Sequence, residues 1–371
     1  MNYNDYNDYN NQNDSFGDDT KEKINFSEWG DDPYTYHGDG APVLIDEEKE
    51  KKNFSRLGFG YALFSVISLA ASLIIQLAVL RLAPDFYQTT LFMNILSPIS
   101  LYVFALPVLL IIISSSEAQA PPKRRMGFGA FLVFLIVSFG CMYIGSYIGN
   151  FTMSVISAVM NYDYSNALNS IIDYDNLWIT AIFTVIVAPI AEELVFRKLI
   201  IDRTQKYGGF VCVLLSALIF GLMHGNLYQF FYCFFLGLIL GYIYYSTGKI
   251  HLTIVIHAII NFFGSIFSAW LSPIAEKMLE LTESSDTEAY IEFLSEHGLE
   301  LLLMSGFSIF IYASMLAAII LPIVLQKKIV LARGEITIPK NRIFKVVFLN
   351  AGILVMLIVY ALEFALNLLP L

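Results

Sequence analysis

Six residues within the apolar part of this sequence have the side chains that acid–base chemistry needs. They occur in three short groups: Glu192, Glu193 and Arg197, then His224, then His257 and Asn261. A charge at the centre of a bilayer costs roughly 2.5–3.5 kcal/mol on insertion scales, so such residues are rarely retained without a role. We therefore interpret the three groups as one site within a membrane.

The two adjacent carboxylates are not equivalent, because neighbouring side chains on a helix point about 100° apart. Arg197 follows Glu193 by four residues, which is a favourable spacing for a Glu–Arg ion pair on one helix face. We predict that this pair is neutralised and orients the helix. Glu192 then has no local partner and is the candidate base toward water. Alternatively, the charges only mark a cytoplasmic helix end, which Arg197 and Lys198 fit better than the glutamates do.

The two histidines each share a helix face with a residue four positions away. His257 and Asn261 can donate two hydrogen bonds toward one point, as an oxyanion site requires. His224, which follows Phe220 by four residues, can carry a proton or bind a metal. Each histidine alone also fits a structural hydrogen bond, but two of them with an acid favour a site. The histidines in polar or interfacial segments are left out: His37, His251 and His297.

The composition is that of a membrane protein. Of the 371 residues, 57% are apolar and 15% are charged, and the mean hydropathy is +0.63. In soluble domains about 45–50% of residues are apolar and about 25% are charged. Continuous apolar runs of about 20 residues predict an all-α, polytopic transmembrane bundle of about eight or nine helices. The net charge of −10 argues against a nucleic-acid partner, and the cysteines form no CxxC pair, so we interpret them as core residues.

The chain divides into a polar segment and nine apolar segments. Residues 1–56, rich in Asn, Asp and Tyr, are predicted to be a disordered acidic tail. Helices are predicted at 57–82, 91–114, 128–160, 177–200, 209–224, 227–246, 250–271, 299–325 and 346–369, the third long enough for one tilted helix or two pieces. We expect N-terminal transmembrane helices in 57–124, the catalytic core in 125–271, an acidic extracytoplasmic loop in 272–298 and C-terminal transmembrane helices in 299–371.

The basic residues set the predicted orientation. With nine helices and a cytoplasmic N-terminus, every Lys and Arg except Arg81 and Lys277 falls in a cytoplasmic segment. This predicts a multi-pass protein of the cell membrane. It also places His224 near the outer end of its helix and Glu192 toward the cytoplasmic side. The two can meet only if helix 209–224 is short or tilted, with a break at Gly225-Asn226 inside the protein.

The motifs EExxxR, FxxxH and HxxxN, in this order on successive membrane helices, resemble those of a known family. This is the CAAX prenyl protease 2 and bacteriocin-processing (CPBP, or Abi) family of intramembrane proteases. The resemblance covers roughly residues 125–270. Each motif alone is weak, whereas the ordered set is fairly specific. The motifs read Glu192-Glu193…Arg197, Phe220…His224 and His257…Asn261.

The resemblance implies a helical-bundle endopeptidase that cleaves membrane-embedded or lipidated protein and peptide substrates in the bilayer. The roles it implies are water activation by Glu192, proton transfer by His224, oxyanion stabilisation by His257 and Asn261, and support of the site by Glu193 and Arg197. The family is commonly labelled a metalloprotease, although a metal-free route is also argued for its members. The sequence lacks HExxH, but Glu192, His224 and His257 together could bind zinc. Zinc is therefore left open as a cofactor.

Two other classes of function stay open. A transporter would use its buried charges to line a pathway, but no internal repeat is seen and the charges cluster in three helices. A non-catalytic membrane protein, such as a bacteriocin-immunity or scaffold protein, would keep the fold without needing Glu192 or His257. The resemblance itself also implies roles in bacteriocin immunity, peptide maturation or the handling of cell-envelope proteins.

Overall fold

The computed structural model describes residues 46–162, 164, 177–284, 286–332, 334–336 and 338–369. Within these ranges the chain forms helices and connections and no strand, which confirms the all-α class. The predicted tail lies outside the described residues up to residue 45. Most of 161–176, the segment between two predicted helices, lies outside them as well.

Seven helical segments in the described part of the chain are long and apolar enough to cross a membrane. They are Glu47–Leu82, Thr90–Ile113, Phe128–Met160, Leu177–Tyr207, Leu227–Thr247, Ile250–Ser284 and Gly298–Val324. A bent pair of helices near the C-terminus makes an eighth span if it is counted as one. The remaining predicted segment is α9 (Gly209–Leu222), whose 14 residues rise only about 21 Å against about 30 Å of hydrocarbon. The chain is thus a multi-pass membrane protein.

Three of the spans contain π-helical stretches, which often occur at functional sites. The second span joins α3 (Thr90–Pro98), η2 (Ile99–Ala105) and α4 (Leu106–Ile113). The span of Glu192 joins α6 (Leu177–Ala181), η4 (Ile182–Val187), α7 (Ala188–Glu192), η5 (Glu193–Lys198), α8 (Leu199–Thr204) and the short 3-10 turn η6 (Gln205–Tyr207). The span of His257 joins α11 (Ile250–Asn261), η7 (Phe262–Phe267) and α12 (Ser268–Ser284).

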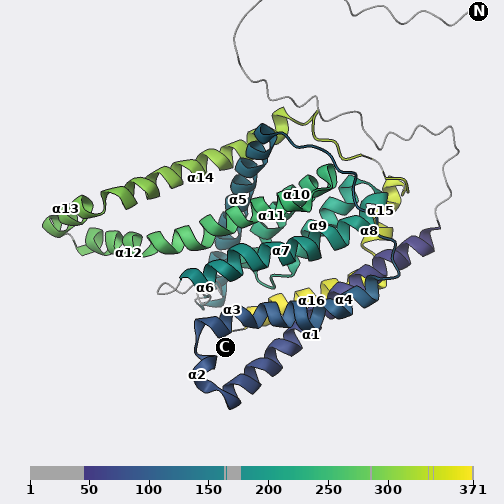
Figure 1. Cartoon of the computed structure of the whole chain (residues 1–371), viewed down its shortest axis with the longest axis horizontal. Coiled ribbons are helices and arrows are strands. Elements are labelled where there is room, and N and C mark those ends of the chain that lie inside the picture. The colour runs from purple at the N-terminus through teal and green to yellow at the C-terminus, as the bar shows by residue number, and fades with distance from the viewer. Residues whose placement is uncertain are drawn as a thin grey trace, which may run out of the picture.

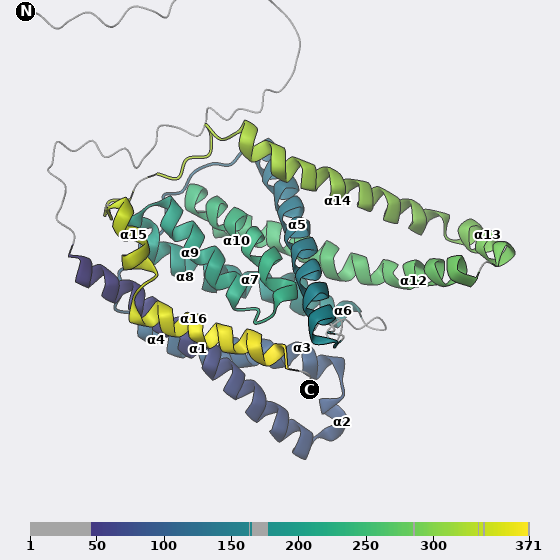
Figure 2. The same cartoon turned by 180° about the vertical axis from the view of Figure 1, so that it is seen from behind.

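The helices that carry the polar groups pack together in the middle of the bundle. Helix α10 (Leu227–Thr247) packs against both α9 and α5 (Phe128–Met160), and α11 lies beside η4, α7 and η5. The long α5, a single helix, crosses the others at a steep angle and also contacts α14 (Gly298–Val324), as Figures 1 and 2 show. The three predicted groups therefore come from adjacent helices.

The first helix begins earlier than predicted, so the tail boundary at residue 56 is wrong. Helix α1 (Glu47–Leu82) includes the polar residues 47–56. The Asp46 side chain accepts a hydrogen bond from the Lys49 backbone N–H at 3.1 Å and caps the helix. Three glutamates in the first turn complement the positive end of the helix dipole. These capping signals outweigh the polar composition that suggested disorder.

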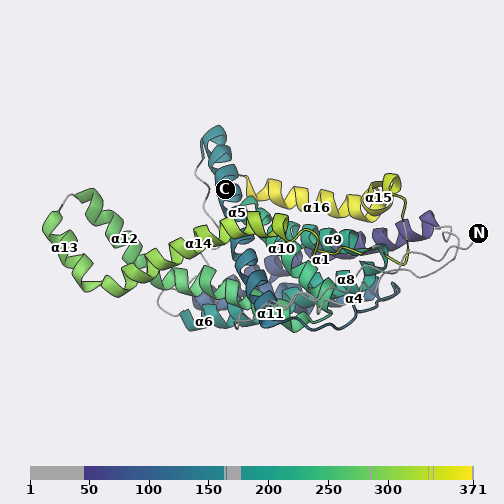
Figure 3. The same ribbon diagram turned by 90° about the horizontal axis from the view of Figure 1, so that it is seen from above.

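The predicted acidic loop at 272–298 is also wrong, because it is mostly helical. Helix α12 continues to Ser284, α13 (Thr287–Glu296) follows, and α14 begins at Gly298. The Asp286 side chain caps α13 by accepting from the Ala289 backbone N–H at 3.1 Å. Figures 1 and 3 show that this helical hairpin projects away from the rest of the bundle. Its glutamates lie on exposed helix faces, where acidic composition does not prevent helix formation.

The predicted break after the short helix is confirmed. Helix α9 ends at Leu222, so His224 lies in the turn that follows. Gly225 has φ +65°, a left-handed conformation that glycine adopts without strain. The Asn226 side chain then caps α10 by accepting from the Gln229 backbone N–H at 3.0 Å. Gly225 itself is buried, and its carbonyl accepts from Asn367 Nδ2 of the last helix at 2.9 Å, so the turn is attached to that helix.

The last helix is fixed against the first by a close crossing. Helices α15 (Lys340–Val347) and α16 (Ala351–Asn367) form the pair bent by 67°, and Figure 2 shows α16 lying along α1. A Cβ added to Gly58 would lie 2.3 Å from the Gly352 carbonyl carbon, so only glycine allows this approach. Further along the same contact, the Ser65 hydroxyl donates to the buried carboxylate of Glu363.

Candidate active site

The Glu193–Arg197 pair predicted from the sequence is present and fully buried. Arg197 Nη2 lies 3.3 Å from Glu193 Oε1, and neither side chain is exposed to solvent. Both residues lie in the π-helical stretch η5, where a separation of four still keeps them on one side. The guanidinium also lies over the Phe220 ring, 4.2 Å from its centroid. The cation therefore balances the buried carboxylate, which would be costly if it stood alone.

His257 is held by this pair. Its Nδ1 donates to Glu193 Oε1 at 3.0 Å, which is the expected direction because a carboxylate paired with a guanidinium accepts. The hydrogen bond selects the tautomer and the orientation of the ring. The opposite nitrogen, Nε2, then faces Glu192 Oε2 at 3.7 Å. His257 thus connects the two glutamates, a contact that separations along the sequence do not reveal.

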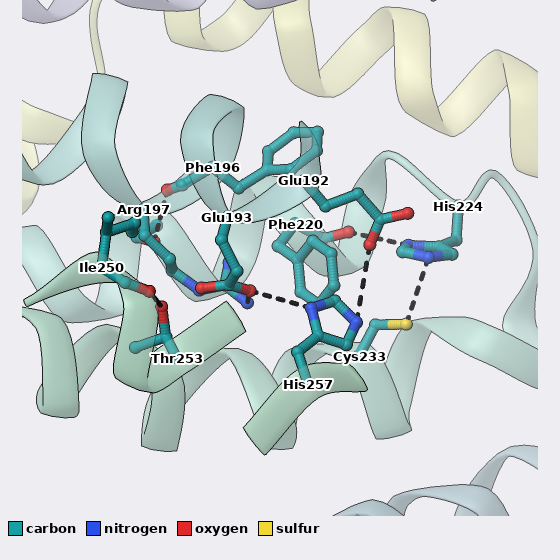
Figure 4. Close-up of polar contacts among 11 residues, drawn as sticks. Glu192, Glu193, Phe196, Arg197, Phe220, His224, Cys233, Ile250, Thr253 and His257 are labelled. Carbon is teal, nitrogen blue, oxygen red and sulfur yellow. Dashed lines mark hydrogen bonds and ion pairs between the residues drawn. The ribbon is translucent and has the colours of Figure 1, made fainter. Parts of the chain in front are cut away.

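Glu192 is the more accessible of the two glutamates. Its side chain is 20% exposed, against 0% for Glu193 and 4% for His257. Figure 4 shows its carboxylate directed toward the rings of His257 and His224. Glu193 is thus buried against Arg197 while Glu192 faces elsewhere, which agrees with the predicted difference in direction between the two side chains. Of the two histidines that the sequence grouped with Glu192, His257 is the one whose ring nitrogen lies beside its carboxylate.

His224 lies near this centre but is tied by two contacts of its own. Its Nδ1 donates to the Phe220 carbonyl at 2.9 Å, and its Nε2 lies 3.4 Å from the Cys233 sulfur. The Phe220 ring packs edge-on against both histidine rings, at centroid distances of 5.1 Å to His224 and 5.8 Å to His257. Phe220 therefore separates and orients the two imidazoles.

Asn261 does not point toward the same place as His257. Its Nδ2 donates to the Thr184 carbonyl on η4 at 2.8 Å, while His257 is engaged with the two glutamates. As the side chains lie, they do not offer N–H groups to one common point. The structure thus brings Asn261 to the contact between α11 and η4 and leaves the predicted oxyanion pair unassembled.

The three residues suggested for zinc do not surround one point as they lie. Glu192 and His257 are neighbours, but the free ring nitrogen of His224 is directed at Cys233. Among the described residues, no three His, Cys, Asp or Glu side chains are arranged to hold a metal ion. This donor set does not fit a three-ligand zinc centre in its present arrangement. Zinc binding stays a prediction.

Several contributors to the site were not foreseen. Cys233 was interpreted as a core cysteine, yet it contacts His224; its place one helix after the histidine, across a tight turn, was the available signal. Phe220 was recognised as part of a motif but given no role. Thr184 contributes a backbone carbonyl, which cannot be predicted from a pattern of side chains.

Comparison with known families bears on the same segment. Residues 174–263 match the model of the type II CAAX prenyl endopeptidase Rce1-like family. This segment is therefore similar to that family, and we call residues 174–263 the Rce1-like domain. This confirms the resemblance to CAAX-processing proteases, and all six predicted site residues lie within the domain. Helices α1, α5 and α14 to α16 lie outside it. No match was found among curated proteins or solved structures.

Proposed function

We propose that the protein is an intramembrane endopeptidase that hydrolyses peptide bonds of membrane-embedded or lipidated proteins. The Rce1-like domain supports the reaction class. The burial of the polar centre within membrane-spanning helices supports a substrate that reaches it through the bilayer. The substrate, rather than a second protein subunit or a nucleic acid, is the partner that the site requires.

The observation that carries the proposal is the 3.7 Å separation between Glu192 Oε2 and His257 Nε2. With Nδ1 donating to Glu193, a neutral His257 presents a lone pair at Nε2. A water about 2.8 Å from both acceptors fits across this gap and donates one hydrogen to each. Its oxygen lone pairs then remain free to attack a peptide carbonyl. Glu192, the more accessible acceptor, takes the proton as the water attacks and returns it to the leaving amine.

The remaining residues support this step. Glu193 and Arg197 fix the His257 ring in the orientation that keeps Nε2 facing Glu192, much as a buried acid orients the histidine of a hydrolase triad. His224 is placed to assist proton transfer if its ring leaves the Cys233 thiol when substrate binds. The proposed oxyanion role of His257 and Asn261 requires a change from their present contacts.

The proposal is tested by comparing membrane proteomes of cells that carry the wild type and Glu192→Gln, using mass spectrometry of peptide termini. Glu192→Gln keeps the size of the side chain and removes the base. Glu283→Gln, on the exposed face of α12, is the matched control and should behave as wild type. Termini that appear with wild type and control but not with Glu192→Gln establish proteolysis and name substrate and cut site. Identical termini in all three, at equal protein abundance, contradict the proposal and favour a transport or immunity function.

A further inference from the structure

The Asn261 amide is used to join two helices rather than left free. It lies at the end of α11, one turn beyond His257, and Nδ2 donates to the Thr184 carbonyl at 2.8 Å. The Thr184 hydroxyl, which donates to the Thr180 carbonyl at 2.8 Å, also lies 3.2 Å from the Ser265 hydroxyl of the other helix. Ser265 in turn donates to the Asn261 carbonyl at 2.5 Å. The junction therefore connects η4, which leads into Glu192, with the helix of His257.

The Thr184 carbonyl needs this partner because of a proline. In η4 the backbone bonds span five residues, as the Ala188 N–H bonding to the Phe183 carbonyl shows. The next bond in this register would run from residue 189 to the Thr184 carbonyl, but Pro189 has no N–H to donate. A carbonyl left unpaired in apolar surroundings is unfavourable. Asn261 supplies from a neighbouring helix the donor that the proline removes.

This contact is close to the reacting groups along both helices. Pro189 precedes Glu192 by three residues, and His257 precedes Asn261 by four. Of the two side chains that frame the 3.7 Å gap, His257 thus stands about one helical turn from Asn261, and Glu192 about two turns from Thr184. A shift of one helix against the other would change the gap directly, because no flexible segment intervenes.

We propose that Asn261 is a positioning residue: it donates to the carbonyl orphaned by Pro189 and so sets the distance between Glu192 and His257. This inference rests on the proposed function for its effect on cleavage, but the contact itself does not. It differs from the oxyanion role, in which the same N–H would have to be free for the substrate.

A double-mutant cycle at residues 189 and 261 separates the two roles. Asn261→Ala should lower cleavage about 10- to 100-fold, since a misplacement near 1 Å has effects of this size. Pro189→Ala restores an N–H that satisfies the Thr184 carbonyl from within the helix, either directly or by returning the turn to α-helical register. If Asn261 is a positioning residue, adding Asn261→Ala to Pro189→Ala should lower cleavage less than threefold. An undiminished loss in the Pro189→Ala background overturns the proposal in favour of an oxyanion donor.

Two measurements do not depend on cleavage. The thermal unfolding midpoint of the purified protein in detergent should fall with Asn261→Ala and recover in the double variant. The ring ¹⁵N NMR signals of His257 should shift in Asn261→Ala, and unchanged signals overturn the proposal. This measurement needs only the single variant, so it still tests the proposal if Pro189→Ala does not fold. Asn150→Ala, an exposed asparagine on α5, is the matched control for both. The variants could show both effects while the wild type shows no Glu192-dependent cleavage. That result contradicts the proposed function and leaves the positioning role intact.

Discussion

Two buried glutamates in this bundle are accommodated in opposite ways. Glu193, inside the Rce1-like domain, is completely buried and contacts both Arg197 and His257. Glu363, on the last helix outside that domain, is 8% exposed and accepts from the Ser65 hydroxyl. Within the described residues, no Lys, Arg or His forms an ion pair with Glu363. One carboxylate is balanced by charge and the other is held by a hydroxyl and by helix packing.

The difference reflects what each glutamate positions. Glu193 fixes an ionisable ring beside Glu192, so its charge bears on the reacting groups. Glu363 lies in the contact between α1 and α16, four residues before Asn367, whose amide holds the turn that carries His224. Charged side chains therefore position the groups at the centre of the site. The surrounding helices hold the His224 turn through hydrogen bonds to its backbone. Substitutions that remove charge should affect the two places very differently.

The largest effect is expected from Glu193→Gln, which leaves Arg197 as an uncompensated buried cation. Breaking a buried ion pair from one side costs about 3–5 kcal/mol. We expect a loss of this size in the free energy of unfolding, measured by denaturant titration in detergent micelles. Adding Arg197→Met should recover most of it, since both charges are then gone. A loss below about 1 kcal/mol for Glu193→Gln would mean that the pair does not carry the charge balance described here.

The next effect concerns rate and not stability. Glu192→Gln should lower the turnover of a cleaved substrate at least about 100-fold, which corresponds to about 2.7 kcal/mol in the barrier. Its unfolding free energy should stay within about 0.5 kcal/mol of wild type, because the side chain is partly exposed and makes no close hydrogen bond. Steady-state kinetics on the purified variant measures the first quantity. Turnover within threefold of wild type would remove Glu192 from the reaction.

A smaller effect is expected where α1 crosses α16. In Gly58→Ala the new methyl group would overlap the Gly352 backbone, and overpacking of this kind costs about 1–3 kcal/mol. Gly306→Ala is the matched control: nothing lies within 4 Å of its added Cβ on α14, so it should be neutral or stabilising by about 0.5–1 kcal/mol. The measurement is the thermal unfolding midpoint of the two variants. Equal midpoints for Gly58→Ala and Gly306→Ala would mean that α1 and α16 do not cross closely at Gly58.

The smallest effect tests the comparison itself. Glu363→Gln keeps an oxygen that can accept from Ser65 and leaves no cation unpaired, so it should cost only about 1 kcal/mol or less. The same substitution at Glu193 should cost several times more. Denaturant titration of both variants under one set of conditions provides the measurement. Equal costs at the two positions would show that burial alone, and not the nature of the partner, sets the energy of these carboxylates.

The sequence predicted those features that depend on local spacing. The Glu193–Arg197 pair follows from a separation of four, and the break after α9 follows from Gly225-Asn226 and from the need to bring His224 inward. The misplaced boundaries at 56 and at 272–298 came from reading polar composition as loop, although Asp46 and Asp286 are good helix caps. Local signals outweighed composition in both places.

The contacts between distant parts of the chain could not be predicted in this way. His257 meets both glutamates because α11 lies beside η5 and α7, an arrangement set by the whole bundle. The partner of Asn261 is a carbonyl made available by Pro189, which can be identified only when the helical register around it is known. A side chain can be assigned to a motif from its neighbours, but its hydrogen-bond partner depends on the fold.

The shortness of α9 has a consequence for the depth at which a substrate must be presented. Fourteen residues extend about 21 Å, so a helix that starts at one edge of the hydrocarbon layer ends about 9 Å short of the other. From such a start, and with the helix along the membrane normal, the His224 turn would lie at that depth, which is nearly two helical turns below the nearer surface. A helical substrate keeps its carbonyls in its own backbone bonds, so it must unwind around the scissile bond before water can attack. Segments with Gly or Pro at this depth, which unwind with the least loss of backbone bonding, would be cut in preference to uninterrupted helices.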